Sequence, residues 1–153
     1  MLCTKISLDI YDMNLIEEHN KKYDFFRRIT GIAMLIHREY KPGLQELAYE
    51  AALKYLLEQE HYKVERQVFV PIYWKDVRLQ DNYRLDLLVN DIIIIELKAT
   101  KQIISDHRKQ LFNYMRLTHK QYGMIINFGM QSLFSEWYEL DVKTNKIEKI
   151  TLM

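Results

Sequence analysis

Four consecutive isoleucines, Ile92–Ile95, are followed at once by Glu96, Leu97 and Lys98, and this segment constrains the fold more than any other. An aliphatic run of this density is typical of a strand buried on both faces, as in the centre of a sheet that helices cover. Glu96 and Lys98 are two residues apart, so their side chains project from the same face of the strand. The sequence therefore predicts a central strand that ends in a carboxylate and an ammonium on one face.

Charged groups at the end of such a strand need partners, because burying an unpaired carboxylate costs several kcal/mol. One possible partner is a bound cation, to which Asp86, ten residues before Glu96, would add a second carboxylate. Carboxylates with an open coordination position suit Mg²⁺ or Mn²⁺, which activates water and stabilises a phosphoryl transition state. Lys98 would then orient the attacking water or neutralise charge on the phosphate. The alternative is a structural ion pair between Glu96 and Lys98.

The chain has 153 residues, a length that suits one domain with a single core. Helical periodicity predicts a helix over residues 24–40, followed by a Lys-Pro-Gly break and a second helix over residues 44–60. The inward residues of the first helix are predicted to be Phe25, Ile29, Ile32, Ala33 and Ile36. Those of the second are predicted to be Leu44, Leu47, Ala48, Ala51 and Tyr55, beside a polar stripe of Glu46, Glu50, Lys54 and Glu58.

Strand-like patterns follow, interrupted by one more helix over residues 105–119 that Ser105 or Asp106 can cap. The predicted strands cover residues 64–74, 83–89, 92–98, 122–128, 137–142 and 147–152. This order predicts an α/β (α+β) domain with a mixed central sheet flanked by helices. The domain is expected to span residues 24–153, with residues 1–23 as an N-terminal lead-in segment.

The connection between residues 83–89 and 92–98 decides whether Asp86 and Glu96 can share a site. A regular hairpin closed by only Asn90 and Asp91 would place the two acids on opposite faces of the sheet. A shared metal site therefore requires a three-residue loop, or a bulge near one of the acids. We predict such an irregularity.

Several short motifs occur in a fixed order along the chain. They are Gly43–Tyr49, which reads G-x-x-E-x-x-Y, then Gln67, Arg84–Val89, Glu96-Leu97-Lys98-Ala99, His107–Gln110 with Tyr114, and Asn127-Phe128-Gly129. In order and spacing they resemble the GxxExxY protein family of the PD-(D/E)XK nuclease superfamily, over roughly residues 25–152. The resemblance implies a restriction-endonuclease-like fold with metal-binding acids on its central strands. The proline that precedes the first acid in the superfamily is replaced here by Leu85.

The resemblance also implies roles for individual residues. Asp86 and Glu96 would be ligands of Mg²⁺ (or Mn²⁺), and Lys98 would be the catalytic lysine. Glu46 would be an additional acid that completes the metal site or holds a water. Gln110 and Tyr114, on the helix after the E-x-K strand, would support the site or contact the phosphate.

Basic residues gather in the part of the sequence that holds this predicted site. Residues 63–120 contain eleven Lys or Arg and seven Asp or Glu, whereas the whole chain has a net charge of only +1. Phosphate attraction would use such an excess, and Arg84, Lys101, Arg108 and Lys109 are the expected nucleic-acid contacts. A solvated charged face is the alternative for each of them. Tyr73 and Trp74 are expected to be core or strand-face residues rather than a base-stacking platform.

Together these features predict a metal-dependent nuclease that hydrolyses phosphodiester bonds of nucleic acid, with DNA as the expected substrate. One alternative is a catalytically silent module of the same fold that binds nucleic acid or a protein partner. Another is a metal-dependent hydrolase of a smaller phosphoester. The single cysteine, Cys3, excludes a disulfide framework, and no segment approaches the length of a membrane span, so we expect a cytoplasmic protein. A homodimer is possible, but no interface is readable from the sequence.

Overall fold

The computed structural model describes residues 13, 15–79 and 83–152. Residues 15–22 are helical and lead into α2 (Asp24–Tyr40), which is followed by α3 (Glu46–Gln59). A third long helix, α4 (Ser105–Thr118), separates β5 from β6. The strands are β1 (Val64–Phe69), β2 (Tyr73–Trp74), β3 (Val77–Arg78), β4 (Arg84–Val89), β5 (Ile93–Lys98), β6 (Tyr122–Asn127), β7 (Phe134–Asp141) and β8 (Lys146–Lys149).

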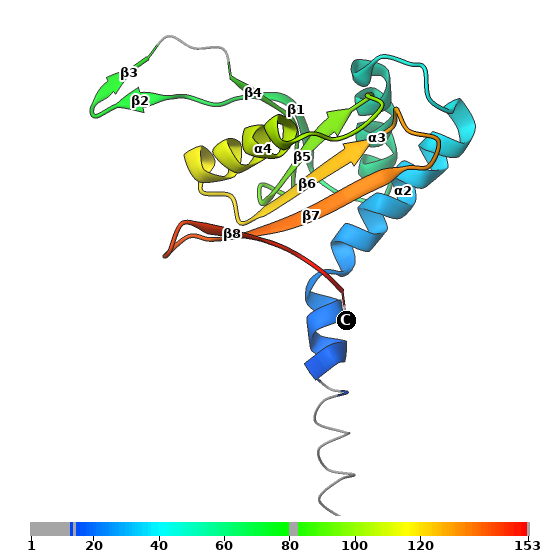
Figure 1. Ribbon diagram of the computed structural model, residues 1–153, viewed down its shortest axis with the longest axis horizontal. Helices are drawn as coiled ribbons and strands as arrows, with labels where there is room; N and C mark the ends of the chain where they lie inside the picture. Colours follow the sequence, from blue (N-terminus) through cyan, green and yellow to red (C-terminus); the bar gives the residue numbers. More distant parts are fainter. Residues whose placement is uncertain (1–12, 14, 80–82, 153) are drawn as a thin grey trace, which may run out of the picture.

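Six strands form one mixed sheet in the order β1-β4-β5-β6-β7-β8 (Figure 1). Only β5 and β6 are parallel, because α4 connects them as a crossover, and every other neighbouring pair is antiparallel. Helices α2 and α3 cover one face of the sheet and α4 covers the other. The predicted fold class, a mixed sheet flanked by helices, is confirmed.

The central strand β5 is buried on both faces, as its aliphatic run predicts. Ile93, Ile95 and Leu97 belong to the core beneath α2 and α3, whereas Ile94 packs in the core beneath α4. Each of these four side chains is at most 1% exposed. The alternation therefore places Glu96 on the α4 side of the sheet.

Helix α3 presents a different face to the core from the one that the sequence predicted. Leu47 and Tyr55 are exposed (56% and 62%), whereas Tyr49, Glu50 and Leu53 are buried. The prediction was wrong because α3 carries apolar residues on more than one face, and the face that it buries also holds a glutamate. The prediction for α2 is confirmed at Ile29, Ala33 and Ile36, which are all buried, with Phe25 and Ile32 partly buried beside them.

The hairpin between β4 and β5 contains the irregularity that the sequence analysis required. Val89 pairs with Ile93, so three residues close the turn instead of two. The last observed pair is Leu87 with Ile95, and the same register continued by one residue would place Asp86 opposite Glu96. Alternation is also broken within β4, because Leu85 and Leu88 both reach the core beneath α4 although they are three positions apart, an odd spacing that would place them on opposite faces of a regular strand.

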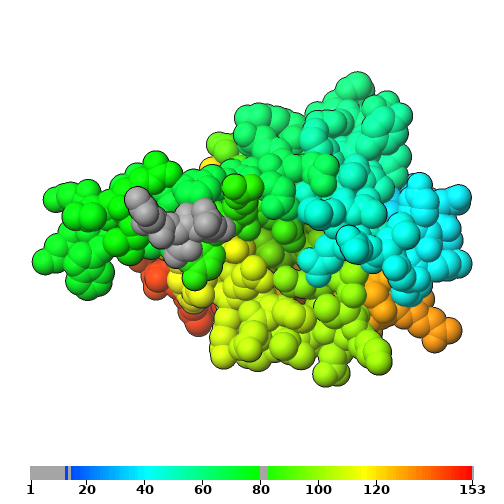
Figure 2. Space-filling model, turned by 90° about the horizontal axis from the view of Figure 1, so that it is seen from above, coloured from blue at the N-terminus to red at the C-terminus, as the bar shows by residue number. Residues whose placement is uncertain are grey.

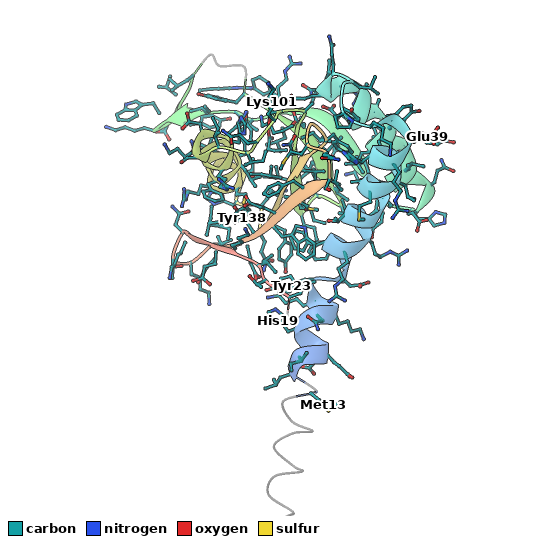
Figure 3. All side chains as sticks on the ribbon, turned by 45° about the vertical axis from the view of Figure 1, so that its right-hand side comes forward. Met13, His19, Tyr23, Glu39, Lys101 and Tyr138 are labelled. Carbon is teal, nitrogen blue, oxygen red and sulfur yellow. The ribbon has the colours of Figure 1, made fainter. Side chains whose placement is uncertain are left out.

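The N-terminal helical turns contact the far end of the sheet. The Lys22 ammonium lies 3.0 Å from a Glu139 carboxylate oxygen, and the Tyr23 hydroxyl donates to the same carboxylate. Figure 3 shows Tyr23 and His19 at this end of the molecule, far from Lys101. The predicted lead-in segment lies partly outside the described residues, which exclude residues 1–12 and 14. Within the described chain, none of the helices combines the length and hydropathy that a membrane span requires.

Candidate active site

The two predicted metal ligands lie beside each other on neighbouring strands. Asp86 is half-buried on β4, and its Oδ2 accepts a hydrogen bond of 2.8 Å from the backbone N–H of Leu97 on β5. Glu96, on β5, is 1% exposed. The hydrogen bond from Leu97 and the contribution of Asp86 to the raised pKa of Glu96 show that the two carboxylates lie close together, as a shared site requires.

Both carboxylates are held in surroundings that disfavour their charge. Burial is the main cause that raises the pKa of Asp86 to about 6, against the hydrogen bond from Leu97. Burial also raises the pKa of Glu96 well above its usual range, and the neighbouring charge of Asp86 adds to the shift. Glu96 Oε1 is buried and has no hydrogen-bond partner. A cation beside the pair would offset the burial of both carboxylates, screen their mutual repulsion and give Glu96 Oε1 a partner.

Lys98 projects from the same side of β5 as Glu96, and α4 holds its ammonium. Its Nζ donates to Gln110 Oε1 at 3.0 Å, and Gln110 Nε2 lies 3.2 Å from the hydroxyl of Tyr114. This chain of polar contacts fixes the Lys98 ammonium near the two acids. The structure thus links three residues of the predicted catalytic set, Lys98, Gln110 and Tyr114, by two hydrogen bonds in series.

The G-x-x-E-x-x-Y motif forms the entry to α3. Gly43 has a φ of +129°, a conformation that other residues rarely adopt, and Glu46 is the first residue of the helix. The Tyr49 hydroxyl donates to the Lys41 carbonyl and lies 3.1 Å from the N–H of Leu44, so one side chain closes the loop before the helix. The motif therefore fixes where α3 begins.

That placement brings Glu46 to the end of the central strand. Its Oε1 lies 3.4 Å from the backbone N–H of Ala99, the residue after Lys98. Its charge contributes to the raised pKa values of Asp86 and Glu96, although it is a smaller cause than burial. Glu46 therefore adds negative potential at the mouth of the site.

Glu50, one turn further along α3, is a site residue that the sequence analysis missed. The sequence analysis places it in a polar stripe beside the apolar face of the helix, but in the structure Lys54 pairs with Glu58 and Glu50 is 1% exposed. Arg66 Nε and Gln67 Nε2 donate to its two oxygens at 2.7 and 3.0 Å. Its charge also contributes to the raised pKa of Asp86. Two signals could have identified Glu50. It lies four residues after Glu46, on the same face of the helix, and its partner Gln67 is one of the motif residues.

The Asn127-Phe128-Gly129 motif anchors the backbone that follows Lys98. Asn127 Oδ1 accepts from the N–H groups of Thr100 and Gly129, and its Nδ2 donates to the Thr100 carbonyl, all at 3.0 Å. Phe128 stacks on Tyr49 with ring centroids 4.5 Å apart. These contacts satisfy the Asn127 amide, so its function here is to hold the loop after β5.

Comparison of the sequence with known protein families gives a match. The profile of the PD-(D/E)XK nuclease superfamily matches residues 23–140, which include every site residue described above. The chain belongs to the PD-(D/E)XK nuclease superfamily. None of the curated proteins compared with the sequence matches it significantly. One solved structure, titled "Crystal structure of SSO0001", superposes with a TM-score of 0.46 and 17% identity, covering 84% of this chain and 65% of that chain.

The residues present fit the divalent metal ion that PD-(D/E)XK nucleases generally use. Within the described chain no group of three or more His, Cys, Asp or Glu is arranged around one point, so the protein offers only the Asp86 and Glu96 carboxylates at close range. Mg²⁺ is commonly held by one or two carboxylates, with water and substrate phosphate as its other ligands. Glu96 Oε1 has no hydrogen-bond partner, so this carboxylate oxygen is available to coordinate such an ion.

The four basic residues predicted to contact nucleic acid differ in their exposure and in whether an acidic side chain already pairs with them. Arg84 and Lys101 are exposed, and Lys109 is exposed beside Asp106 at 3.3 Å. Arg108 instead directs two guanidinium nitrogens at Glu136, at 2.7 and 2.9 Å. Burial alone would raise the pKa of Glu136, but hydrogen bonds from Arg108, Tyr138 and Lys149 hold it at about 2. Arg108 thus neutralises the buried Glu136 carboxylate while one third of its own side chain remains exposed.

Proposed function

We propose that this PD-(D/E)XK superfamily member is a metal-dependent nuclease, most similar to the GxxExxY family, that hydrolyses phosphodiester bonds of nucleic acid, with DNA as the expected substrate. The observation that carries the proposal is the buried Glu96 Oε1, which lacks a partner beside a second desolvated carboxylate. Folding such a pair is unfavourable unless a ligand compensates for it, and a purely structural ion pair would leave no orphaned oxygen. Cytoplasmic location remains a prediction.

In this proposal Asp86 and Glu96 would hold Mg²⁺ or Mn²⁺, which when bound supplies charge neutralisation at the scissile phosphate and an acidified water. Lys98 orients the attacking water or stabilises negative charge that develops on the phosphate oxygens. Gln110 fixes the direction of the Lys98 ammonium, and Tyr114 fixes Gln110. Gln110 and Tyr114 are therefore positioning residues, and Glu46 completes the acidic rim.

A cleavage assay tests the proposal. Purified protein is incubated with supercoiled and single-stranded DNA in Mg²⁺ or Mn²⁺, beside Glu96→Gln and Lys98→Ala. Glu148→Gln and Lys146→Ala, at exposed positions of β8, are the matched controls. Cleavage that both site variants lose and both controls retain is the expected result. Site variants that cleave as fast as the wild-type protein would contradict the proposal.

Metal binding distinguishes the nuclease from a catalytically silent module. Calorimetry of the wild-type protein with Mn²⁺ is expected to show binding that Glu96→Gln abolishes. If the wild-type protein binds nucleic acid but no Mn²⁺, the silent module is correct. Cleavage of a small phosphodiester but not of DNA or RNA would instead favour the hydrolase of smaller substrates.

A further inference from the structure

A groove beside the proposed active site is not used by the proposed reaction. It has a volume of about 690 Å³ and lies between α4 and the segment that leads into and out of the β2–β3 ribbon. This volume is in the range of sites that hold a small organic group. Its lining combines rings and amides with cations: Tyr83, His107, Lys109, Gln110, Asn113 and Arg116 are the members used below.

The groove continues directly from the catalytic centre. Gln110, which accepts the Lys98 hydrogen bond, is one of its walls, and so is Tyr114. Tyr83 packs edge-on against Tyr114 with ring centroids 6.1 Å apart, and 44% of Tyr83 remains exposed. A molecule with its phosphate at Lys98 would therefore have its next group in contact with an aromatic surface.

The β2–β3 ribbon extends the aromatic surface away from the body of the protein (Figures 1 and 2). Tyr73 pairs with Arg78 and Trp74 with Val77, so Trp74 and Val77 share one face of the ribbon. Tyr73 and Trp74 are 57% and 68% exposed on β2, so of the two expected positions, core or strand face, they occupy the strand face. In the described chain the ribbon pairs with no strand of the six-stranded sheet, and its Tyr73, Trp74 and Val77 are each more than half exposed.

The charge along this path favours an anionic chain. Among the described residues that line the groove, Lys109 and Arg116 are basic and the one acid is Asp106, which lies 3.3 Å from Lys109. Arg78 lies on the ribbon, over the ring of Phe69. Arg84 is exposed at the start of β4, between the ribbon and the active site. Cations interleaved with exposed rings are typical of surfaces that bind single-stranded nucleic acid, where each unpaired base offers a face for stacking. In a duplex those faces are already stacked on neighbouring bases.

We propose that the groove between α4 and the β2–β3 ribbon binds an unpaired base next to the cleaved phosphate, with Trp74 on the path of the same strand. The preferred substrate is then a single-stranded stretch of nucleic acid. Tyr83 stacks on the base, and the Asn113 amide is placed to reach a base edge. This assignment rests on the proposed nuclease function only for the position of the cut.

Equilibrium binding tests the groove without requiring cleavage. Fluorescence anisotropy in EDTA compares the wild-type protein on a labelled 20-nucleotide DNA strand and on the blunt duplex of the same sequence. The strand is expected to bind at least 10-fold more tightly than the duplex. Tyr83→Ala and Trp74→Ala are each expected to weaken strand binding about 10-fold, in line with the loss of one stacking contact. Tyr83→Phe, which keeps the ring, retains binding.

Tyr55→Ala is the matched control, because Tyr55 is 62% exposed on α3, outside the groove. Circular dichroism melts check that all variants are folded, and Tyr83→Phe keeps the test valid if Tyr83→Ala does not fold. Equal affinity for strand and duplex, or wild-type affinity of folded Tyr83→Ala and Trp74→Ala, overturns the assignment. A dimer in sedimentation that Trp74→Ala converts to monomer, with strand binding unchanged, also overturns it in favour of a second copy of the chain. Selective strand binding without cleavage under any metal would refute the nuclease and retain the groove.

Discussion

Replacing Asp86 with asparagine should stabilise the metal-free protein at neutral and alkaline pH. Burial holds the pKa of this carboxyl at about 6, above its unfolded value of 3.8. Above pH 6 the folded protein must therefore carry an ionised carboxylate in an unfavourable place. Asparagine has nearly the same shape, keeps an oxygen that can accept the Leu97 N–H, and carries no charge.

The size of the effect follows from the two pKa values. Each pKa unit corresponds to about 1.4 kcal/mol, so the shift of Asp86 amounts to at most about 3 kcal/mol. Because Asp86 is only half-buried, we expect about 2 kcal/mol. A raised folded-state pKa destabilises progressively as pH rises from about 4 to about 6. The gain of the variant should therefore be complete at pH 8 and nearly absent at pH 4.

Urea unfolding in EDTA at pH 8 and pH 4 measures this difference, with Asp76→Asn as the control. Asp76 is exposed in the turn between β2 and β3, and its substitution should change the free energy of unfolding by less than about 0.5 kcal/mol at either pH. A gain for Asp86→Asn that is equal at both pH values, or a loss at pH 8, would refute the electrostatic reasoning. Added Mg²⁺ should narrow the difference at pH 8 by stabilising only the wild-type protein.

Three further outcomes follow from the structure. Glu136→Gln should lower the free energy of unfolding at pH 7 by about 2–3 kcal/mol. Urea titrations from pH 5 to pH 2 should show this loss vanish, because the lowered pKa of Glu136 stabilises the wild-type protein only while the carboxylate is ionised. Gly129→Ala should destabilise by about 2–3 kcal/mol in thermal melts, because its Cβ would lie 2.3 Å from the backbone nitrogen of Thr100, whereas Gly31→Ala, in open space on α2, should stabilise by about 1 kcal/mol. If the proposed nuclease function holds, Gln110→Ala should reduce kcat about 10-fold in steady-state cleavage assays with little change in KM, because it frees the Lys98 ammonium without touching either proposed metal ligand; an effect on KM alone would contradict this role.

The central hairpin shows how much of the site could be predicted from the sequence. The aliphatic run that ends at Glu96 predicts a central strand, and strand parity then requires an irregular turn if Asp86 is to share its face. The three-residue loop from Asn90 to Ile92 supplies that shift. This argument uses only local rules, which is why it succeeded without a structure.

Helix α3 shows where local rules fail. Its sequence carries apolar residues on more than one face, so periodicity alone selected Leu47 and Tyr55 where the structure buries Leu53 and its neighbours. The buried face is set by the polar cluster beneath it, where Glu50 receives hydrogen bonds from Arg66 and Gln67. Those partners lie on β1, and only the tertiary structure brings them to the helix.

The β2–β3 ribbon shows a second property that depends on tertiary structure, namely the exposure of its side chains. Strand-forming residues such as Tyr73 and Trp74 predict extended backbone, and that prediction is confirmed. Whether a strand has a layer to pack against depends on the rest of the fold, and here the ribbon lies outside the main sheet. Residues that are normally interpreted as core then become available for binding.

The unfavourable charges at the site explain why its surroundings are held so firmly. Asp86 and Glu96 each cost stability when ionised, so the elements that carry them would relax apart if neighbouring contacts did not oppose it. Asn127 provides three hydrogen bonds to the loop after β5 and the turn after β6, and the Tyr49–Phe128 stack joins α3 to the same place. These contacts involve no ionisable group of the site, so they hold equally well with or without a metal ion. Asn127, Phe128 and Tyr49 therefore hold the end of β5 beside α3 through contacts that are independent of the two acids.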